Sequence, residues 1–223
     1  MSESDAPKPP EGDSAPTPDA GGNTFNQRIA HSPVTARVPE RVARGAFSTG
    51  VIVIDGPFEF VLDFIMGLVQ PRQVVARVIL TPVVVEQFIH AIRENVSKYE
   101  VRFGKIPEIP KPVPPPKQPT IQEIYDDLKM SDETHAGSYA NAVLMSHGTS
   151  EFTFDFITRF FPTAAVAARV FLAAPQVPRL LESLTVSLNR YKQRVEANRN
   201  QQGGNRPPTD PPLSHPPMGP GPV

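Results

Sequence analysis

The sequence predicts an α+β protein made of two repeats, each a three-stranded antiparallel β-meander followed by one long amphipathic α-helix. Three observations support this prediction. The chain matches itself at a constant offset of 92 residues, apolar residues alternate with period two in the first part of each copy, and they recur every three or four residues in the second part. We expect the two copies to pair with each other as a pseudo-dimer, because each alone has a small core and exposed sheet edges.

The internal duplication rests on two motifs that align without a gap. Residues 59–65 match residues 151–157, and residues 76–80 match residues 168–172. Between residues 47–103 and 139–195, 15 of 57 positions are identical. A single offset across both motifs indicates a tandem duplication.

Three strands are predicted in each copy. Residues 51–54 and 142–145 are apolar runs typical of a strand, and each is followed by a turn that contains Gly56 or Gly148. In the next strand the alternation places aromatic side chains on one buried face and acidic side chains on the other. Residues 74–81 and 166–173 form the third predicted strand.

The hydrophobic period then changes to that of a helix, which begins near Pro82 in the first copy and near Pro175 in the second. We expect each helix to cover the sheet of its own copy and to bury its aromatic stripe. The predicted core and helix-seam residues are Phe60, Leu62, Phe64, Phe88, Ile92, Val96, Phe152, Phe154, Phe156, Leu181, Leu184 and Leu188.

Proline marks the segments between and around the copies, with 22 of the 28 prolines lying in three stretches. Such stretches bury too little apolar surface to offset the entropy of ordering. The predicted organisation is a disordered arm at 1–44, repeat 1 at 45–104, a linker at 105–137, repeat 2 at 138–199 and a disordered tail at 200–223. A short helix is expected near 120–130, with Thr120 and Glu123 as its capping box.

Several pieces of both copies resemble a known family. They are residues 139–143, Ser146-His147, Glu151-Phe152 and Asp155-Phe156 from the second copy, and residues 76–80 and 94–104 from the first. Together they are similar to a small bacterial domain family of unknown function, family 3467. Neither copy holds every piece, because the first lacks the Ser-His pair and the second lacks the Glu-Asn element of the helix. The resemblance implies a bacterial origin and a short domain, and it implies no activity.

The charged residues of the predicted strands form one candidate site in each copy. Glu59 and Asp63 lie next to Arg77, and Glu151 and Asp155 lie next to Arg169. Paired carboxylates on one strand face are compatible with a catalytic centre. Cross-strand ion pairing on a solvated or interfacial face explains them more simply, and we expect these pairs to help specify strand register or subunit pairing.

The remaining candidate residues favour structural roles. His147 lies in a predicted turn beside Ser146 and Glu151, and neighbours on one hairpin rarely converge as a catalytic triad. The five histidines show no metal-ligand spacing, and the chain has no cysteine. The basic end of the second helix could contact a phosphate, and the proline-rich tail could dock in an aromatic groove. No catalytic residue, cofactor site or metal site is predicted.

The predicted function is that of a non-catalytic scaffold or adaptor that assembles through its paired repeats and contacts other proteins through the repeats and the proline-rich arms. A homodimer is an open possibility. The alternative is a single-stranded nucleic-acid-binding protein that uses the sheet face, although a net charge of −1 gives it no general attraction to nucleic acid. The acidic residues 1–5 contain no apolar signal core and no apolar run reaches the length of a membrane span, so we expect a cytoplasmic location and no membrane partner.

Overall fold

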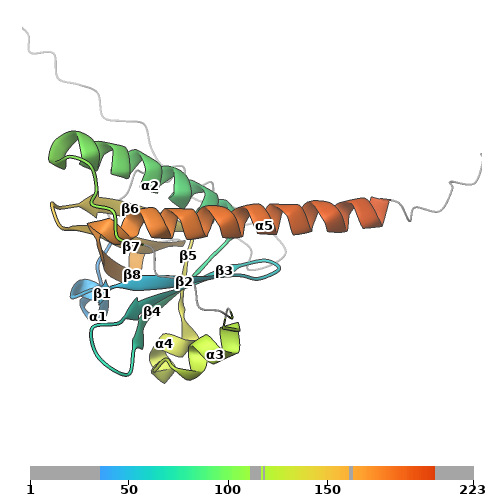
Figure 1. Ribbon diagram of the computed structural model, residues 1–223, viewed down its shortest axis with the longest axis horizontal. Helices are drawn as coiled ribbons and strands as arrows, with labels where there is room; N and C mark the ends of the chain where they lie inside the picture. The colour runs from blue at the N-terminus through green and yellow to red at the C-terminus, as the bar shows by residue number, and fades with distance from the viewer. Residues whose placement is uncertain (1–35, 111–116, 118, 161–162, 204–223) are drawn as a thin grey trace, which may run out of the picture. The chain divides into compact units, whose positions relative to one another are not determined.

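The computed structural model describes residues 36–110, 117, 119–160 and 163–203, with the side chains of 201–203 excepted. The protein is α+β, as predicted, with two four-stranded sheets and a long C-terminal helix (Figure 1). The elements of the first half are α1 (Glu40–Ala43), β1 (Ala46–Ser48), β2 (Gly50–Asp55), β3 (Phe60–Met66), β4 (Gln73–Leu80), α2 (Pro82–Phe103) and α3 (Ile121–Asp126). Those of the second half are α4 (Asp132–Ala136), β5 (Ser138–Ala140), β6 (Ala142–His147), β7 (Glu151–Phe160), β8 (Thr163–Ala173), a 3₁₀ turn (Ala174–Gln176) and α5 (Val177–Gly203).

Each sheet combines three strands of one repeat with one strand of the other. The first sheet has the order β2-β3-β4-β5, and the second has the order β1-β8-β7-β6. The strands of each meander pair antiparallel, whereas the donated strands β5 and β1 pair parallel with β4 and β8. The predicted three-stranded sheets are therefore corrected to four strands, because each repeat covers one edge of the other repeat's sheet.

A single residue separates the donated strand from the strand that follows it. Thr49 lies between β1 and β2, and Asn141 lies between β5 and β6. The backbone N–H of Thr49 donates to the carbonyl of Ile65 at 2.8 Å, and that of Asn141 donates to the carbonyl of Ile157 at 2.9 Å. The side chains of both residues also bond to the backbone of the neighbouring hairpin. These bonds hold the bend at which one continuous stretch of chain leaves one sheet and enters the other.

The helices cover the sheets in an exchanged arrangement. On α2, Phe88 lies with its ring centroid 5.3 Å from that of Phe154 and 5.6 Å from that of Phe156, both on β7. On α5, Tyr191 meets Phe60 of β3 at 5.5 Å. The expectation that each helix buries the stripe of its own copy is therefore wrong. Both stripes are apolar and aromatic, so periodicity alone does not distinguish one from the other.

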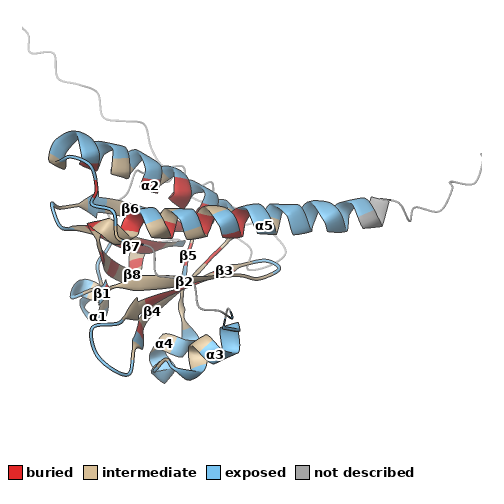
Figure 2. Cartoon of the chain, in the orientation of Figure 1, coloured by how far each residue is buried: buried red, intermediate tan, exposed pale blue. Residues whose placement is uncertain are grey.

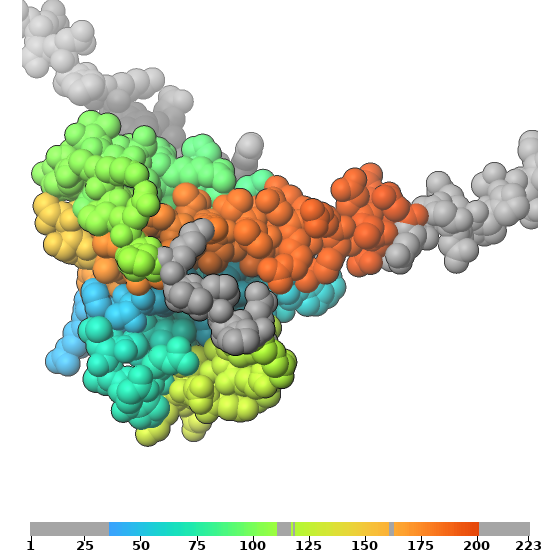
Figure 3. Space-filling model, viewed as in Figure 1, coloured from blue at the N-terminus to red at the C-terminus, as the bar shows by residue number. Residues whose placement is uncertain are grey.

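One continuous core joins the two halves. Helices α2 and α5 contact each other and lie side by side at the surface (Figure 3). Among the residues expected in the core, Val96 and Leu181 are partly buried and the others are buried. The buried positions of both helices face the sheets, while α5 beyond Leu188 is mostly exposed (Figure 2). Aromatic contacts such as the tilted pair of Phe64 and Phe156, with ring centroids 5.7 Å apart, connect the two sheets directly.

The structural correspondence begins earlier than the sequence match. Arg37 forms a parallel bridge with Ala165, and Lys129, 92 residues later, forms one with Gln73. Helix α1 then corresponds to α4, and each is followed by a glycine with positive φ, Gly45 at 64° and Gly137 at 73°. Residues 129–137, expected as part of the linker, therefore pack against the first sheet as residues 37–45 pack against the second. Identity between these segments is almost absent, which is why the sequence did not reveal them.

Candidate functional site

The outward face of the first sheet carries a buried ion pair. Asp63 of β3 and Arg77 of β4 are direct cross-strand neighbours. Arg77 donates from Nε to Asp63 Oδ1 and from Nη2 to Asp63 Oδ2, both at 2.7 Å. The Asp63 side chain is 0% exposed and that of Arg77 is 16% exposed. A two-point, charge-assisted pair of this kind has a specific geometry as well as a strong electrostatic component.

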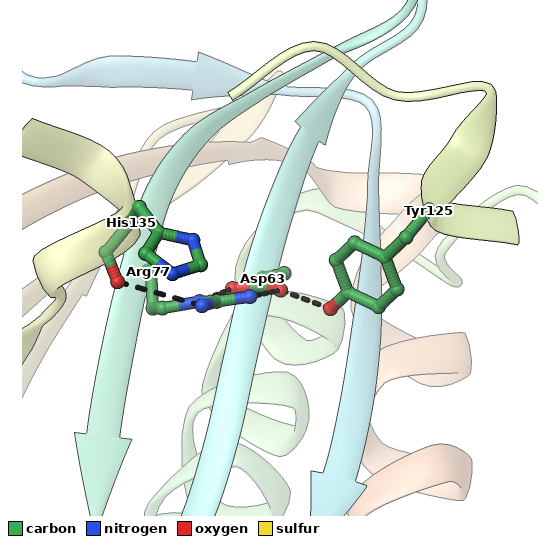
Figure 4. Close-up of polar contacts among 4 residues, drawn as sticks. All are labelled: Asp63, Arg77, Tyr125 and His135. Atoms are coloured by element: carbon green, nitrogen blue, oxygen red, sulfur yellow. Dashed lines mark hydrogen bonds and ion pairs between the residues drawn. The ribbon is translucent and has the colours of Figure 1, made fainter. Parts of the chain in front are cut away.

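Tyr125 of α3 completes this cluster from outside the sheet (Figure 4). Its hydroxyl donates to Asp63 Oδ2, and the Arg77 guanidinium lies 5.9 Å from the centre of its ring. The predicted capping box is present: the Thr120 hydroxyl accepts from the Glu123 N–H, and the Glu123 carboxylate accepts from the Thr120 N–H. The cap starts α3 at a fixed point and so positions Tyr125 over the face.

The electrostatics of the cluster favour the charge states seen in an ion pair. The hydrogen bond with Asp63 raises the pKa of the Arg77 guanidinium, although burial opposes this effect. Burial raises the pKa of Tyr125 to about 12, and the hydrogen bond to the Asp63 carboxylate adds to the shift. A neutral tyrosine therefore donates its proton to a carboxylate that is already neutralised by an arginine. The backbone carbonyl of His135 also accepts from Arg77 Nη1, at 3.4 Å.

The outward face of the second sheet repeats the ion pair without the tyrosine. Arg169 donates to both oxygens of Asp155, at 2.7 and 2.8 Å, and this bond raises the pKa of the guanidinium. The Asp155 side chain is 19% exposed, and no described residue occupies the place that Tyr125 has beside Asp63. Phe47 and Leu144 of the same face are 41% and 44% exposed. We call Phe47, Leu144, Asp155 and Arg169 the open face.

The other two predicted carboxylates lie elsewhere. Glu59 and Glu151 follow the β2–β3 and β6–β7 turns, and their side chains fold over Gly56 and Gly148. Glu59 Oε2 accepts from the Phe58 N–H at 3.2 Å. The prediction that Glu59 and Glu151 lie beside Arg77 and Arg169 is corrected. The Nε and Nη2 donors of each guanidinium bond to Asp63 or Asp155 instead.

The basic end of α5 is engaged within the chain. Arg194 lies 2.7 Å and Arg190 3.7 Å from the carboxylate of Asp55, whose side chain is nearly buried at the end of β2. Lys192 pairs with Glu86 of α2 at 2.6 Å. These three bases, which belong to the helix end that the sequence offered for a phosphate contact, therefore pair with the first sheet and with α2.

His147 occupies the position in the second repeat that Asp55 has in the first. The rings of Phe152, Tyr99 and Phe103 surround it at 5.2, 5.8 and 6.2 Å, and its Nδ1 atom is buried without a hydrogen bond in the described part of the chain. Ser146 lies on the opposite face of β6, because successive side chains alternate. The neighbours named for a triad therefore point apart. Residues 206–217, proposed to dock in an aromatic groove, lie outside the described residues.

No group of three or more His, Cys, Asp or Glu side chains among the described residues could hold a metal ion. None of the described helices has the length and apolar character to cross a membrane.

The fold and the two faces define a class: a two-repeat α+β protein in which each repeat completes the sheet of the other. Residues 5–108 and 111–196 match the family model described as "Protein of unknown function (DUF3467)". The chain belongs to this family and carries two tandem copies of it. No curated protein and no solved structure matches the chain.

Sequence reasoning missed Tyr125 as a partner of Asp63. The expected short amphipathic helix contained it, but nothing in the spacing indicated which face that helix would meet. The bend residues Thr49 and Asn141 were also missed as anchors of the strand exchange. A small residue, Ser48 or Ala140, precedes each bend in the sequence, and it is fully buried in the structure.

Proposed function

We propose that this protein is a non-catalytic scaffold or adaptor whose open face docks an amphipathic helical segment of a partner protein. The single observation that carries the proposal is the difference between two equivalent faces. The chain's own α3 occupies the face around Asp63, whereas the face around Asp155 has the same ion pair and no such cover in the described residues.

The chemistry of the occupant follows from α3. This helix presents Tyr125, which donates to the buried carboxylate, beside the half-buried Ile124. The open face offers the Asp155 carboxylate with Leu144 directly opposite it on β6. A partner segment with a tyrosine hydroxyl and an adjacent aliphatic side chain would therefore satisfy the carboxylate and cover the apolar surface.

In a protein of this kind the arginine–aspartate pairs of the two sheets have a structural role. Arg77 and Arg169 each donate from Nε and Nη2 to an aspartate of the same sheet. Such fixed ion pairs suit a rigid binding surface better than a catalytic group that exchanges protons. The proline-rich segments at 1–44 and 200–223 are proposed as a second set of partner contacts.

A peptide of residues 119–128 is a direct probe, because it carries the α3 side chains without the rest of the chain. We expect amide chemical-shift changes in the full-length protein around Leu144 and Phe47, weakened when the peptide carries Tyr125→Phe. The protein variant Leu144→Glu should abolish them, while Val101→Glu, at an exposed site on α2, should not. Shifts that spread elsewhere, or that persist in Leu144→Glu, would overturn the proposal.

One observation favours nucleic-acid binding as the second candidate. Tyr139 and Phe160 are exposed and stack with centroids 6.2 Å apart and planes 7° from parallel, next to the exposed Arg159. Bases of a single strand stack on such aromatic side chains, at about 1–3 kcal/mol per base. Labelled oligo(dT) distinguishes the two candidates. Micromolar binding at physiological salt that is lost in the Tyr139→Ala, Phe160→Ala double variant and kept in Val101→Glu would replace the scaffold proposal.

A further inference from the structure

A pocket of about 250 Å³ lies where the two repeats meet on their outward side. Its lining consists of seven pairs of residues separated by 92 positions, so every lining residue of one repeat is matched by its counterpart in the other. Strands β4 and β8 contribute the small side chains of Ala76 and Ala168, while α1 and α4 contribute Arg41 and Glu133. The volume equals that of about eight waters at about 30 Å³ each, which is enough for a small organic molecule.

The lining carries an excess of positive charge. Arg41, Arg77 and Arg169 line the pocket together with one carboxylate, that of Glu133. The aspartates that pair with Arg77 and Arg169 lie on the adjoining strands β3 and β7 and are not part of the lining. An anion in the pocket would therefore meet the guanidinium groups before it met the paired carboxylates.

Two of these arginines have donors to spare. Arg169 uses Nε and Nη2 on Asp155, which leaves Nη1 without a partner in the described part of the chain. Arg41 is exposed and has no hydrogen bond or ion pair there. Planar guanidinium groups match the oxygens of carboxylate and phosphate groups at two points.

The position of Arg41 corresponds to that of Glu133, and this pair is the one place where the lining changes the sign of its charge. No ion pair joins the two side chains within the described residues. An anionic group would be attracted to the side of Arg41 and Arg169 and repelled by Glu133. A hydroxyl or amine at the other end of the same ligand would find an acceptor in Glu133.

We propose that this inter-repeat pocket binds a small molecule with a carboxylate or phosphate group at the end near Arg41 and Arg169. The pocket shares Arg169 with the open face, but Phe47, Leu144 and Asp155 do not line it, so anion binding can be tested separately from the partner docking proposed above.

Titration calorimetry with sodium phosphate and with sodium succinate tests the proposal and distinguishes the two anion types. Ionic strength is held constant with sodium chloride, because screening alone would otherwise imitate competition. We expect saturable binding of at least one anion. Arg41→Ala should weaken it about tenfold, corresponding to the loss of one charge-assisted contact of about 1.4 kcal/mol.

A substitution that adds positive charge should raise the affinity for the anion, which a general loss of stability cannot do. Glu133→Arg places a second arginine at the position equivalent to Arg41, and we expect it to tighten binding at least threefold. Arg44→Ala is the matched control, because Arg44 is exposed just beyond the same helix and does not line the pocket.

Absence of saturable binding by either anion would overturn the proposal. Equal losses in Arg41→Ala and Arg44→Ala would also overturn it, since they would indicate attraction to the general surface. The Leu144→Glu variant should bind the anion as the unchanged protein does, which keeps failure of the pocket distinguishable from failure of the docking face.

Discussion

Asp63 and Asp155 make the same bidentate contact with an arginine in two different surroundings. Asp63 is sealed by its sheet and by Tyr125, whereas the Asp155 side chain remains 19% exposed. A buried ion pair contributes little net stability while intact, but the loss of one partner leaves an uncompensated buried charge. An ion pair at the surface contributes less net stability, and the loss of one of its partners destabilises the protein less.

The two arginines therefore predict unequal costs. Arg77→Leu should destabilise the protein by about 3–5 kcal/mol, because it strands the Asp63 carboxylate. Arg169→Leu should cost about 1 kcal/mol, because water reaches Asp155. Urea unfolding of the two variants measures both values. Equal costs would show that the cover provided by α3 does not shield Asp63.

Tyr125 adds a pH dependence to this cluster. Its pKa is raised from 10.0 to about 12 in the folded chain, so folding favours the protonated hydroxyl. The stability that this preference contributes is present below pH 10 and is lost as the pH rises toward 12. We expect the stability advantage of the unchanged protein over Tyr125→Phe to shrink between pH 10 and 12. An advantage that stays constant across this window would contradict the raised pKa.

At the scale of the elements, the short helices α1 and α4 precede the strand that each repeat donates to the other repeat's sheet. Helices α1 and α4 are each followed by a glycine with positive φ, Gly45 and Gly137, after which the chain enters the donated strand. A Cβ on Gly45 would collide with the ring of Phe171 and lie 2.9 Å from Arg169 Cγ. Gly104, which ends α2 with φ 87°, has open space around it.

These glycines separate backbone strain from side-chain collision. Gly104→Ala should cost about 1–3 kcal/mol from its backbone conformation alone. We expect Gly45→Ala to cost more than Gly104→Ala by about 1 kcal/mol or more, because β1 must also move away from β8. Thermal or urea unfolding of the two variants gives the comparison, and a Gly45→Ala cost at or below that of Gly104→Ala would contradict it.

At the scale of the whole molecule, the exchange of strands and helices makes each half dependent on the other. The edge of each sheet is covered by a strand of the other repeat, and Phe88 and Tyr191 each pack on the other repeat's aromatic stripe.

Cleavage of the linker tests this dependence. A protease site placed within residues 111–116 should allow the chain to be cut while the two halves remain together in size-exclusion chromatography, since the exchanged contacts bury both aromatic stripes. The melting temperature should become dependent on concentration after the cut. Separation of the halves under native conditions would contradict the prediction.

Much of the local structure was predictable. The alternation of Phe60, Leu62 and Phe64 predicts a strand with one buried face, and these residues are buried in β3. The cross-strand pairing of Asp63 with Arg77 also follows from two neighbouring strands in register. Strands β1 and β5 were not predicted, because a three-residue strand shows too little of any period.

The sequence by itself determined the duplication, the order of the three meander strands and the long helix in each copy, and the apolar stripe on those elements. Tertiary structure alone decided which stripe meets which, where the chain bends at Thr49 and Asn141, and which of two equal faces Tyr125 covers. The physical reason is that periodicity reports that a face is apolar, and hydrophobic burial has no direction. Two repeats with similar stripes can therefore exchange helices without any change in pattern, and only the packing of particular side chains distinguishes the outcomes.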